Sequence, residues 1–398
     1  MVVVGVDAHK RTHTLVAIDN SGRKLGEKTA STTDPGLTEA IAWVLERFGP
    51  DTMWALEDSR TYTMRLEQRL LKTAPWKVVR CPPHLMARTR RSSREYGKSD
   101  PIDALAVART ALREPDLPAA VHDRVSWELR QLVEWREHLV AQRVGVILRL
   151  YEHLHLIDPA APTPNRLDKR IRREALAQQL RTTTGFLAEI ARDELDEIEY
   201  LSRRIDTHTA RVVSQIDDLN SSLLTIAGCA HLTAAKLIGE AANADRFRSA
   251  DAFAMYSGVA PIPAWSGNSA GRLRTCPGGN RQINAALHRI AIIQLARPGL
   301  ARTYVQRRRD AGDSGRTAVR RLKRHLSRVV FNRLRADYLH RQNSSADSPP
   351  AAYRDDSEHP PVWSDVVTLA DQLDHDDPSP RRRRTTLIDT AGVPDDIP

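Results

Sequence analysis

The chain has 398 residues, of which 41% are hydrophobic, so it can fill the cores of about two or three domains and is mostly folded. Its 60 Lys and Arg against 50 Asp and Glu give a formal net charge of +10, which favours a polyanionic partner such as nucleic acid. Three widely spaced cysteines argue against a disulfide framework and a CxxC zinc site. The chain shows neither a signal sequence nor an apolar run of membrane length, which favours a soluble, cytoplasmic protein.

The chain begins with a short apolar run, VVVGV, that stops at the carboxylate Asp7. Such a run predicts a buried strand that delivers one acid to the edge of a sheet. Two further runs, THTLVAID and KLGEKTAS, predict antiparallel strands that follow it. An acid after a strand is more often a turn residue than a metal ligand, so Asp7 alone does not define a site.

Strands and helices then alternate, which is typical of an α/β domain. Residues 34–48 have apolar side chains at helical spacing, and the run MWALED predicts a buried strand that ends at Glu57. The segment TYTMRLEQRLLK is helical in pattern, and WKVVRCPP predicts a strand closed by two prolines. Asp58, beside Glu57, leaves open which of the two acids has a function.

A helix start follows the basic segment RTRRSSREYGK. Pro101 suits the first helical position, which makes Asp100 the predicted N-cap and places Asp103 in the first turn on the same side. Two interpretations stay open. The two acids either stabilise the helix start through capping and the helix dipole, or hold a metal ion together.

The middle third is charged, with apolar residues three and four apart over residues 127–156 and 186–224. We expect long amphipathic helices here, as a coiled coil, a spacer or a dimerisation arm. The next segment, LLTIAGCAHLTAAKLIGEAANADRF, resembles a helix-hairpin-helix element whose turn offers N–H groups to a phosphate. Ala230 stands where that element has its second glycine, so a buried helical hairpin is an equal alternative.

A loop rich in Gly, Ser and Pro follows, SGVAPIPAWSGNSAGRLRTCPGGN, and then a helix from about Arg281. Small residues allow a phosphate backbone to approach, arginines hold its oxygens, and a helix N-terminus adds its dipole. The candidate phosphate ligands are Arg272, Arg274 and Arg281. A serine in this loop is a candidate nucleophile, and an ordinary turn-rich loop is the alternative.

The positive charge is concentrated in the C-terminal part. Residues 266–341 contain 18 Lys and Arg against 3 Asp and Glu, whereas residues 342–398 contain 5 against 12. The first of these ranges includes helical sequence whose basic face suits a nucleic-acid backbone, although a solvated helix face is the commoner meaning. The second is rich in Ser, Pro and Asp and predicts a disordered tail.

Four carboxylates thus recur at ends of predicted elements: Asp7, Glu57, Asp100 and Asp103. Each acid has an ordinary structural explanation as a turn or capping residue, but the binding of divalent metal ions accounts for all four. Oxygen-rich sites suit Mg²⁺ or Mn²⁺. Two such ions about 3.5–4 Å apart stabilise both the attacking and the leaving oxygen of a phosphodiester exchange.

These motifs resemble those of the transposases and site-specific recombinases of the IS-one-ten class of insertion sequences, to which the Piv-type DNA invertases are related. The resemblance rests on VGVDAHK, LED, KSDPIDA and SGVAPIPAWSGNSAGRLRTCPGGNRQINAAL, and it covers roughly residues 1–340. It implies a RuvC-like N-terminal domain with an RNase H-type fold, and a DEDD metal site at Asp7, Glu57, Asp100 and Asp103.

The resemblance also implies a C-terminal serine nucleophile that forms a transient phosphoserine link to DNA. That serine falls on Ser266, with Ser269 as the fallback. It further implies that a structured RNA encoded by the element chooses the DNA targets. Protomers are implied to assemble on DNA, as a dimer or tetramer, with composite active sites.

We therefore expect an α/β plus all-α protein in four parts. These are a RuvC-like metal-binding domain (1–115), a helical or coiled-coil region (116–222), a C-terminal serine transposase domain (223–341) and a disordered tail (342–398). The expected function is a bacterial, nucleoid-associated transposase or recombinase that acts through Ser266 with Mg²⁺ or Mn²⁺. The alternatives are a metal-dependent nuclease or Holliday-junction resolvase that uses water, and a non-catalytic nucleic-acid-binding protein.

Overall fold

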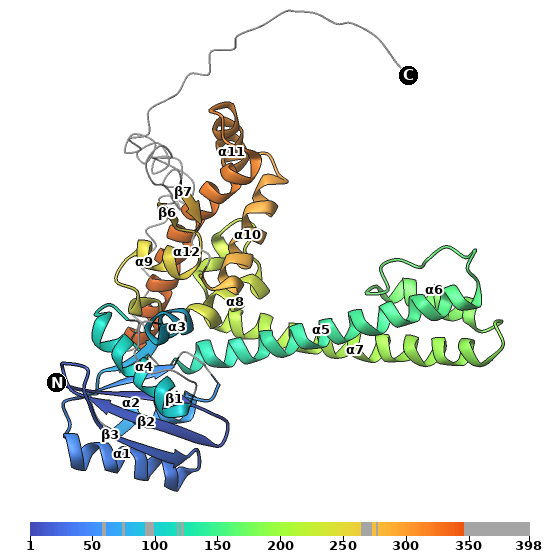
Figure 1. The fold of residues 1–398 in the computed structure, drawn as a ribbon. Coiled ribbons are helices and arrows are strands. Elements are labelled where there is room, and N and C mark those ends of the chain that lie inside the picture. The colour runs from blue at the N-terminus through green and yellow to red at the C-terminus, as the bar shows by residue number, and fades with distance from the viewer. Residues whose placement is uncertain are drawn as a thin grey trace, which may run out of the picture.

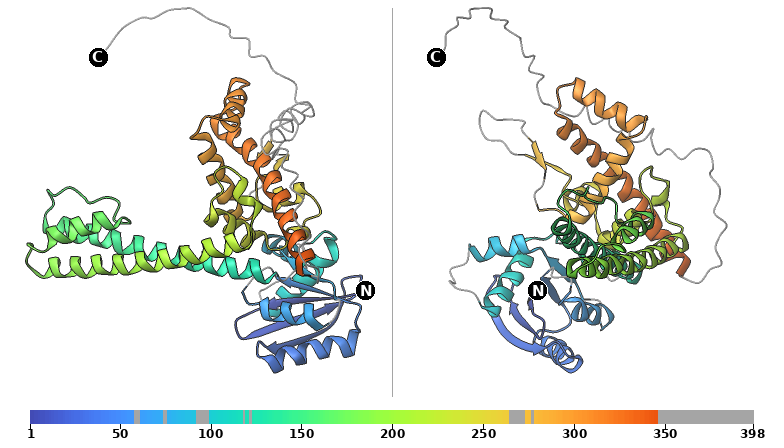
Figure 2. Two further views of the ribbon diagram at one scale, coloured as in Figure 1. Left: turned by 180° about the vertical axis from the view of Figure 1, so that it is seen from behind. Right: turned by 90° about the vertical axis from the view of Figure 1, so that its right-hand side faces the viewer.

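The computed structural model describes residues 1–57, 61–73, 76–91, 99–117, 119–120, 123–263, 273–275 and 278–345. An N-terminal α/β domain, a long two-helix arm and a C-terminal helical domain follow one another along the chain (Figure 1). The arm projects away from the other two parts, as the left view in Figure 2 also shows.

The N-terminal domain is built on a five-stranded sheet with the order β3-β2-β1-β4-β5. Strands β1, β2 and β3 are antiparallel neighbours, whereas β4 and β5 run parallel to β1. The parallel part is covered on both faces, which explains why β1 is a continuous apolar run and not an alternating one. The strands are β1 (Val2–Ala8), β2 (Thr12–Ile18), β3 (Lys24–Ser31), β4 (Thr52–Glu57) and β5 (Val78–Cys81).

Helices cover the two faces of this sheet. Val4 and Val6 pack with α1 (Asp34–Phe48) and α2 (Met64–Thr73), whereas Val3 packs with α3 (Pro83–Arg91) and α4 (Asp100–Arg113). The prediction of an α/β N-terminal domain is therefore confirmed. Residues 83–91 form a helix, where the sequence analysis predicted only the end of a strand followed by a basic segment.

The start of α4 differs by one residue from the prediction. The N-cap is Ser99, which is extended and makes no side-chain capping bond, and Asp100 is the first helical residue. The prediction that Asp100 is the N-cap is wrong, because Pro101 occupies the second helical position and not the first. The Asp100 side chain consequently does not close the helix end.

The arm consists of two long helices from the same chain that lie side by side in opposite directions (Figure 1). Their contact is apolar, with Leu139 and Leu150 on one helix against Ile198 and Ile205 on the other. The prediction of long amphipathic helices is confirmed, and the pairing is within the chain. The helices are α5 (Arg124–Ile157), α7 (Phe186–Asp218) and, near the tip, the short α6 (Arg170–Leu180).

The C-terminal domain shares its core with the base of the arm, where Leu129 and Ile216 join the cluster that contains Leu322. The helix-hairpin-helix prediction is not confirmed, because within residues 222–247 a single α-helix is flanked by two short 3-10 helices. The elements are η1 (Ser222–Thr225), α8 (His231–Ala241), η2 (Ala244–Arg246), α9 (Ala250–Tyr256), β6 (Pro261–Pro263), β7 (Leu273–Thr275), α10 (Arg281–Leu295), α11 (Leu300–Asp310) and α12 (Gly315–Ser345).

Helix α12 continues to Ser345, and the rest of the predicted tail lies outside the described residues. Cys81 and Cys229 are buried and form no disulfide with a described residue, and Cys276 lies outside the described ranges. In the part of the chain that the structure describes, no helix combines the length and the hydropathy that a membrane crossing requires.

His13 of β2 makes the α/β domain sensitive to acid. Its side chain is 1% exposed, neither ring nitrogen has a described hydrogen-bond partner, and burial, with His9 nearby, lowers its pKa. The unfolded chain therefore binds a proton that the folded domain does not, and stability falls as the pH drops below about 6.5. We expect His13→Leu to reduce the loss of thermal midpoint between pH 8 and pH 5. Exposed His155→Leu should behave as wild type, and equal losses in all three proteins would contradict the assignment.

Candidate functional site

Asp7 lies near the carboxyl end of β1 and is 4% exposed. Its Oδ2 atom is buried and accepts no well-aligned hydrogen bond from a described residue. His9 Nε2 lies 3.1 Å from this oxygen and 3.2 Å from Oδ1 of Asp100. The imidazole thus bridges two carboxylates that come from positions more than ninety residues apart.

The charges of these groups act on one another. Burial raises the pKa of Asp7, the Asp103 and Asp100 carboxylates raise it further, and His9 opposes them. Burial lowers the pKa of His9, but the attraction of Asp7 and Asp100 outweighs burial and the net shift is upward. The site therefore concentrates negative charge around one buried oxygen, and a cation lowers the cost of that arrangement.

A glycine in β1 makes the arrangement possible. A Cβ atom at Gly5 would lie 2.2 Å from the Ala104 carbonyl oxygen and 2.4 Å from the Ala108 nitrogen, so the backbone of α4 lies directly against the strand. Asp100 and Asp103 are in the first turn of α4. The close approach of this helix brings its first turn to the end of β1, where Asp7 stands.

Glu57 occupies the equivalent position on the neighbouring parallel strand. In the parallel pairing, Val6 of β1 lies opposite Leu56 of β4. Asp7 and Glu57 are the next residues of these two strands. Side chains alternate along a strand, and Val3 and Ala55 face α4. Asp7 is four residues after Val3, and Glu57 is two residues after Ala55. Because both separations are even, the two acids lie on the face of the sheet that α4 covers. Asp58 lies outside the described residues.

The donor set fits a divalent cation that prefers oxygen. Single ligand atoms of Asp7, His9 and Asp100 lie within 4.8 Å of one another, and the buried Oδ2 of Asp7 is available as a ligand. Asp103 contributes negative charge at the same place, and Glu57 is next in register. His9 was not predicted from the sequence. The available signal was its position two residues after Asp7 in VVVGVDAHK, just beyond the end of β1.

The second candidate region is carried by a two-stranded hairpin, β6 and β7, in the C-terminal domain. The nucleophile candidates Ser266 and Ser269, together with Arg272, lie outside the described residues. Arg274 is an exposed residue of β7, and Arg281 is the exposed first residue of α10. The hairpin and the β1 sheet belong to different domains and are separated in every view (Figures 1 and 2).

The base of the hairpin is fixed by a backbone contact between two glycines. A Cβ at Gly279 would lie 2.1 Å from the nitrogen of Gly258, whose φ of 67° is in the left-handed region. Asn280 donates its backbone N–H to the Tyr256 carbonyl at 2.6 Å, and the Asn284 amide donates to the Ser257 carbonyl at 3.0 Å. The motifs Ser257-Gly258 and Gly278-Gly279-Asn280, which flank this loop in the sequence, are therefore in contact.

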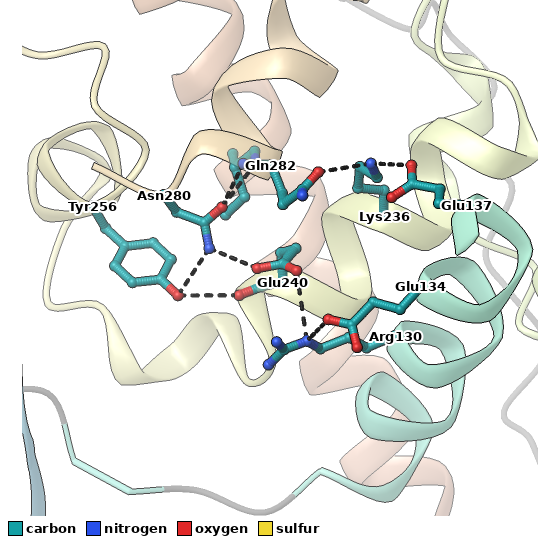
Figure 3. Close-up of polar contacts among 9 residues, drawn as sticks. Arg130, Glu134, Glu137, Lys236, Glu240, Tyr256, Asn280 and Gln282 are labelled. Carbon is teal, nitrogen blue, oxygen red and sulfur yellow. Dashed lines mark hydrogen bonds and ion pairs between the residues drawn. The ribbon is translucent and has the colours of Figure 1, made fainter. Parts of the chain in front are cut away.

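A polar network ties this base to the arm (Figure 3). Glu240 of α8 is buried and accepts a 2.6 Å hydrogen bond from the Asn280 side chain. Asn280 also caps α10, since its Oδ1 accepts from the Ile283 N–H at 3.0 Å. Arg130 of α5 lies 3.6 Å from the other oxygen of Glu240. The start of α10 is thereby held to the first turns of the arm.

A second link of the same network runs beside the first. Lys236 of α8 contacts Glu137 of α5 and donates to Gln282 at 2.8 Å (Figure 3). Gly239 permits the close crossing of α8 and α5, because a Cβ there would lie 2.9 Å from the Arg130 Cα atom. The hairpin is consequently carried by a stiff assembly of three helices.

Two family models match the chain. Residues 4–159 match the DEDD transposase model of IS110, and residues 220–306 match the model described as the transposase IS116/IS110/IS902 family. The first match covers the α/β domain and all of α5, and the second covers α8 to α10, the hairpin and the first part of α11.

Proteins of insertion elements are similar along most of the chain. The uncharacterized 42 kDa protein of IS900 from Mycobacterium paratuberculosis is 25% identical, over 84% of this chain and 96% of the relative. The uncharacterized 44.8 kDa protein of IS116 from Streptomyces clavuligerus is 25% identical, over 83% and 94%. Among solved structures, Thermus thermophilus RuvC is matched with a TM-score of 0.23 and 20% identity, over 28% of this chain and 92% of RuvC.

Gly5→Val should separate α4 from β1. The added side chain meets helix backbone and not a flexible side chain, so we expect a loss of about 3 kcal/mol in the free energy of unfolding. Urea unfolding of the purified protein measures this loss. Gly26→Ala is the matched control in the same sheet, because its nearest neighbour is a Trp43 ring atom at 3.4 Å. Equal effects of the two substitutions would contradict the close-packing explanation.

Asp7→Asn should remove divalent-cation binding. We expect Mg²⁺ or Mn²⁺ at about a hundredfold excess over the dissociation constant to stabilise the wild type by about 2.7 kcal/mol, measured from thermal unfolding. The variant should show no such gain and should be at least as stable as wild type without metal, because a buried charge is gone. Asp51→Asn, an exposed acid just before β4, is the control and should keep the gain. A full metal response in Asp7→Asn would exclude this site.

Proposed function

The chain belongs to the IS116/IS110/IS902 family of transposases, and on this basis we propose that it recombines DNA with two separate functional groups. The first is a metal site of Asp7, Glu57, Asp100 and Asp103 on a RuvC-like domain of RNase H type. The second is a serine nucleophile, Ser266, on the hairpin loop. The observation that carries the proposal is the meeting of acids from β1 and α4 around the buried oxygen of Asp7.

The residues divide the chemistry between them. A divalent metal held by the four acids would supply charge stabilisation for a phosphodiester that changes its bonds. Ser266 attacks the backbone phosphorus, the bond to the next nucleotide breaks, and the strand stays joined to the protein as a phosphoserine ester. Arg272, Arg274 and Arg281 hold the phosphate oxygens. Attack by a strand end on the ester rejoins the DNA and frees the serine.

The separation of the two regions favours a site composed from two protomers. The metal site is on the sheet domain, and the hairpin is held to the arm and the helical domain through Glu240 and Asn280. We therefore propose a dimer or tetramer on DNA, in which the serine of one protomer meets the metal site of another. We also propose that a structured RNA from the element guides target choice and that the protein is located at the bacterial nucleoid.

Ser266→Ala should abolish recombination and covalent attachment to DNA while DNA binding persists. Removal of a covalent nucleophile lowers the rate on the order of 10⁴-fold or more. The measurement is a denaturing gel that traps protein–DNA adducts on nicked substrate with Mg²⁺. Ser269→Ala is the matched control and should still form the adduct.

The opposite pattern, with the adduct lost only in Ser269→Ala, would move the nucleophile to Ser269. Strand cleavage by wild type without any adduct would instead indicate a metal-dependent nuclease or junction resolvase that uses water. Binding without cleavage by wild type, with or without metal, would indicate a non-catalytic nucleic-acid-binding protein.

A further inference from the structure

A groove of about 580 Å³ lies between α10 and α12 in the C-terminal domain. Its walls carry basic side chains from both helices, with the apolar Ala285, Ile292 and Val319 beside them, and none of the described residues that line it is an Asp or Glu. The polar lining residues are Arg281, Asn284 and His288 of α10 and Arg316, Arg320 and Lys323 of α12.

The cations of this groove form no ion pair with a described residue, whereas several others on α12 do. Elsewhere on α12, Arg321 lies 3.0 Å from Asp313 and Arg335 lies 3.1 Å from Asp245. Among the described residues, no ion pair involves Arg281, Arg316, Arg320 or Lys323. The described acids thus pair with other cations of α12, and the groove keeps its positive charge.

Lys323 is the most buried of these cations, with 9% of its surface exposed. Its Nζ donates to Oδ1 of Asn284, whose amide in turn holds the Ser257 carbonyl at the hairpin base. Burial, with the nearby Arg320, lowers the pKa of Lys323 to about 8. A buried cation whose described hydrogen-bond partner is a neutral amide is costly, and a bound anion offsets that cost.

The spacing of the cations indicates an extended ligand. Arg316, Arg320 and Lys323 are four and three residues apart, so they follow one face of α12 over about 10 Å. This length exceeds a single phosphate group. The groove also includes Arg281, the first residue of α10, so its cations come from two helices.

We infer that this groove binds the sugar–phosphate backbone of a nucleic-acid strand, at a site separate from the four acids. Guanidinium groups bind phosphate oxygens bidentately, and contacts to phosphate position a strand without reading its bases. The inference does not rest on the proposed chemistry, because a chain that never cleaves DNA would still show this binding.

The test is the salt dependence of binding by Arg316→Ala/Arg320→Ala, measured in EDTA so that no cleavage occurs. Each phosphate contact contributes about −0.9 to the slope of log K against log [salt] for duplex DNA and about −0.7 for single strands. Loss of two contacts should make the DNA slope shallower by about two. The affinity lost between about 50 and 200 mM salt should then shrink about tenfold.

Arg302→Ala/Arg309→Ala is the matched control, since both residues are exposed on the neighbouring α11 and the charge removed is the same. It should keep the wild-type slope, as should Arg316→Lys/Arg320→Lys. Both target arginines are exposed and form no described ion pair, so circular dichroism should show an unchanged fold.

Parallel titrations with duplex DNA and with single-stranded RNA identify the strand. A shallower slope for DNA, for RNA or for both supports the groove and names its ligand. An unchanged slope with both ligands, or an equal change in the α11 control, would overturn the inference. Neither result depends on the adduct assay for Ser266, so the two proposals can fail separately.

Discussion

Helix α4 lies so close to β1 that position 5 has no room for a side chain. This contact joins two parts of the chain that are about a hundred residues apart, and it determines where Asp100 and Asp103 stand relative to Asp7. Backbone packing of this kind is stiff, because neither a helix nor a central strand can yield locally. The acid cluster is therefore a property of the fold and not of flexible side chains that happen to meet.

The cluster is unfavourable by itself. The carboxylates of Asp100 and Asp103 lie near that of Asp7, and the pKa of Asp7 is raised mainly by burial and further by these two negative charges. His9 offsets part of it by bridging Asp7 and Asp100. Electrostatic repulsion between carboxylates persists where the surrounding packing holds them together, and it favours the binding of a ligand with concentrated positive charge. The close packing of α4 against β1 thus accounts for both the positions of the acids and the repulsion between them.

The sequence predicts the parts of the site that depend on local patterns. Hydrophobic runs that stop at Asp7 and Glu57 identify the strand ends, and Pro101 identifies the start of α4 within one residue. The role of Gly5 and the bridging position of His9 were not predictable, because both depend on which helix packs against β1. The helix-hairpin-helix prediction was not confirmed, since a glycine turn before one helix has the same local signature.

The arm adds a mechanical property. Helix α5 has 34 residues and is about 51 Å long, and its first turns contact the residues that hold the hairpin base. A continuous helix pair of this length acts as a lever. A tilt of about 5° at its base moves the tip by about 4 Å. Conversely, a load applied at the tip reaches Arg130 and Glu240 with a smaller displacement and a greater force.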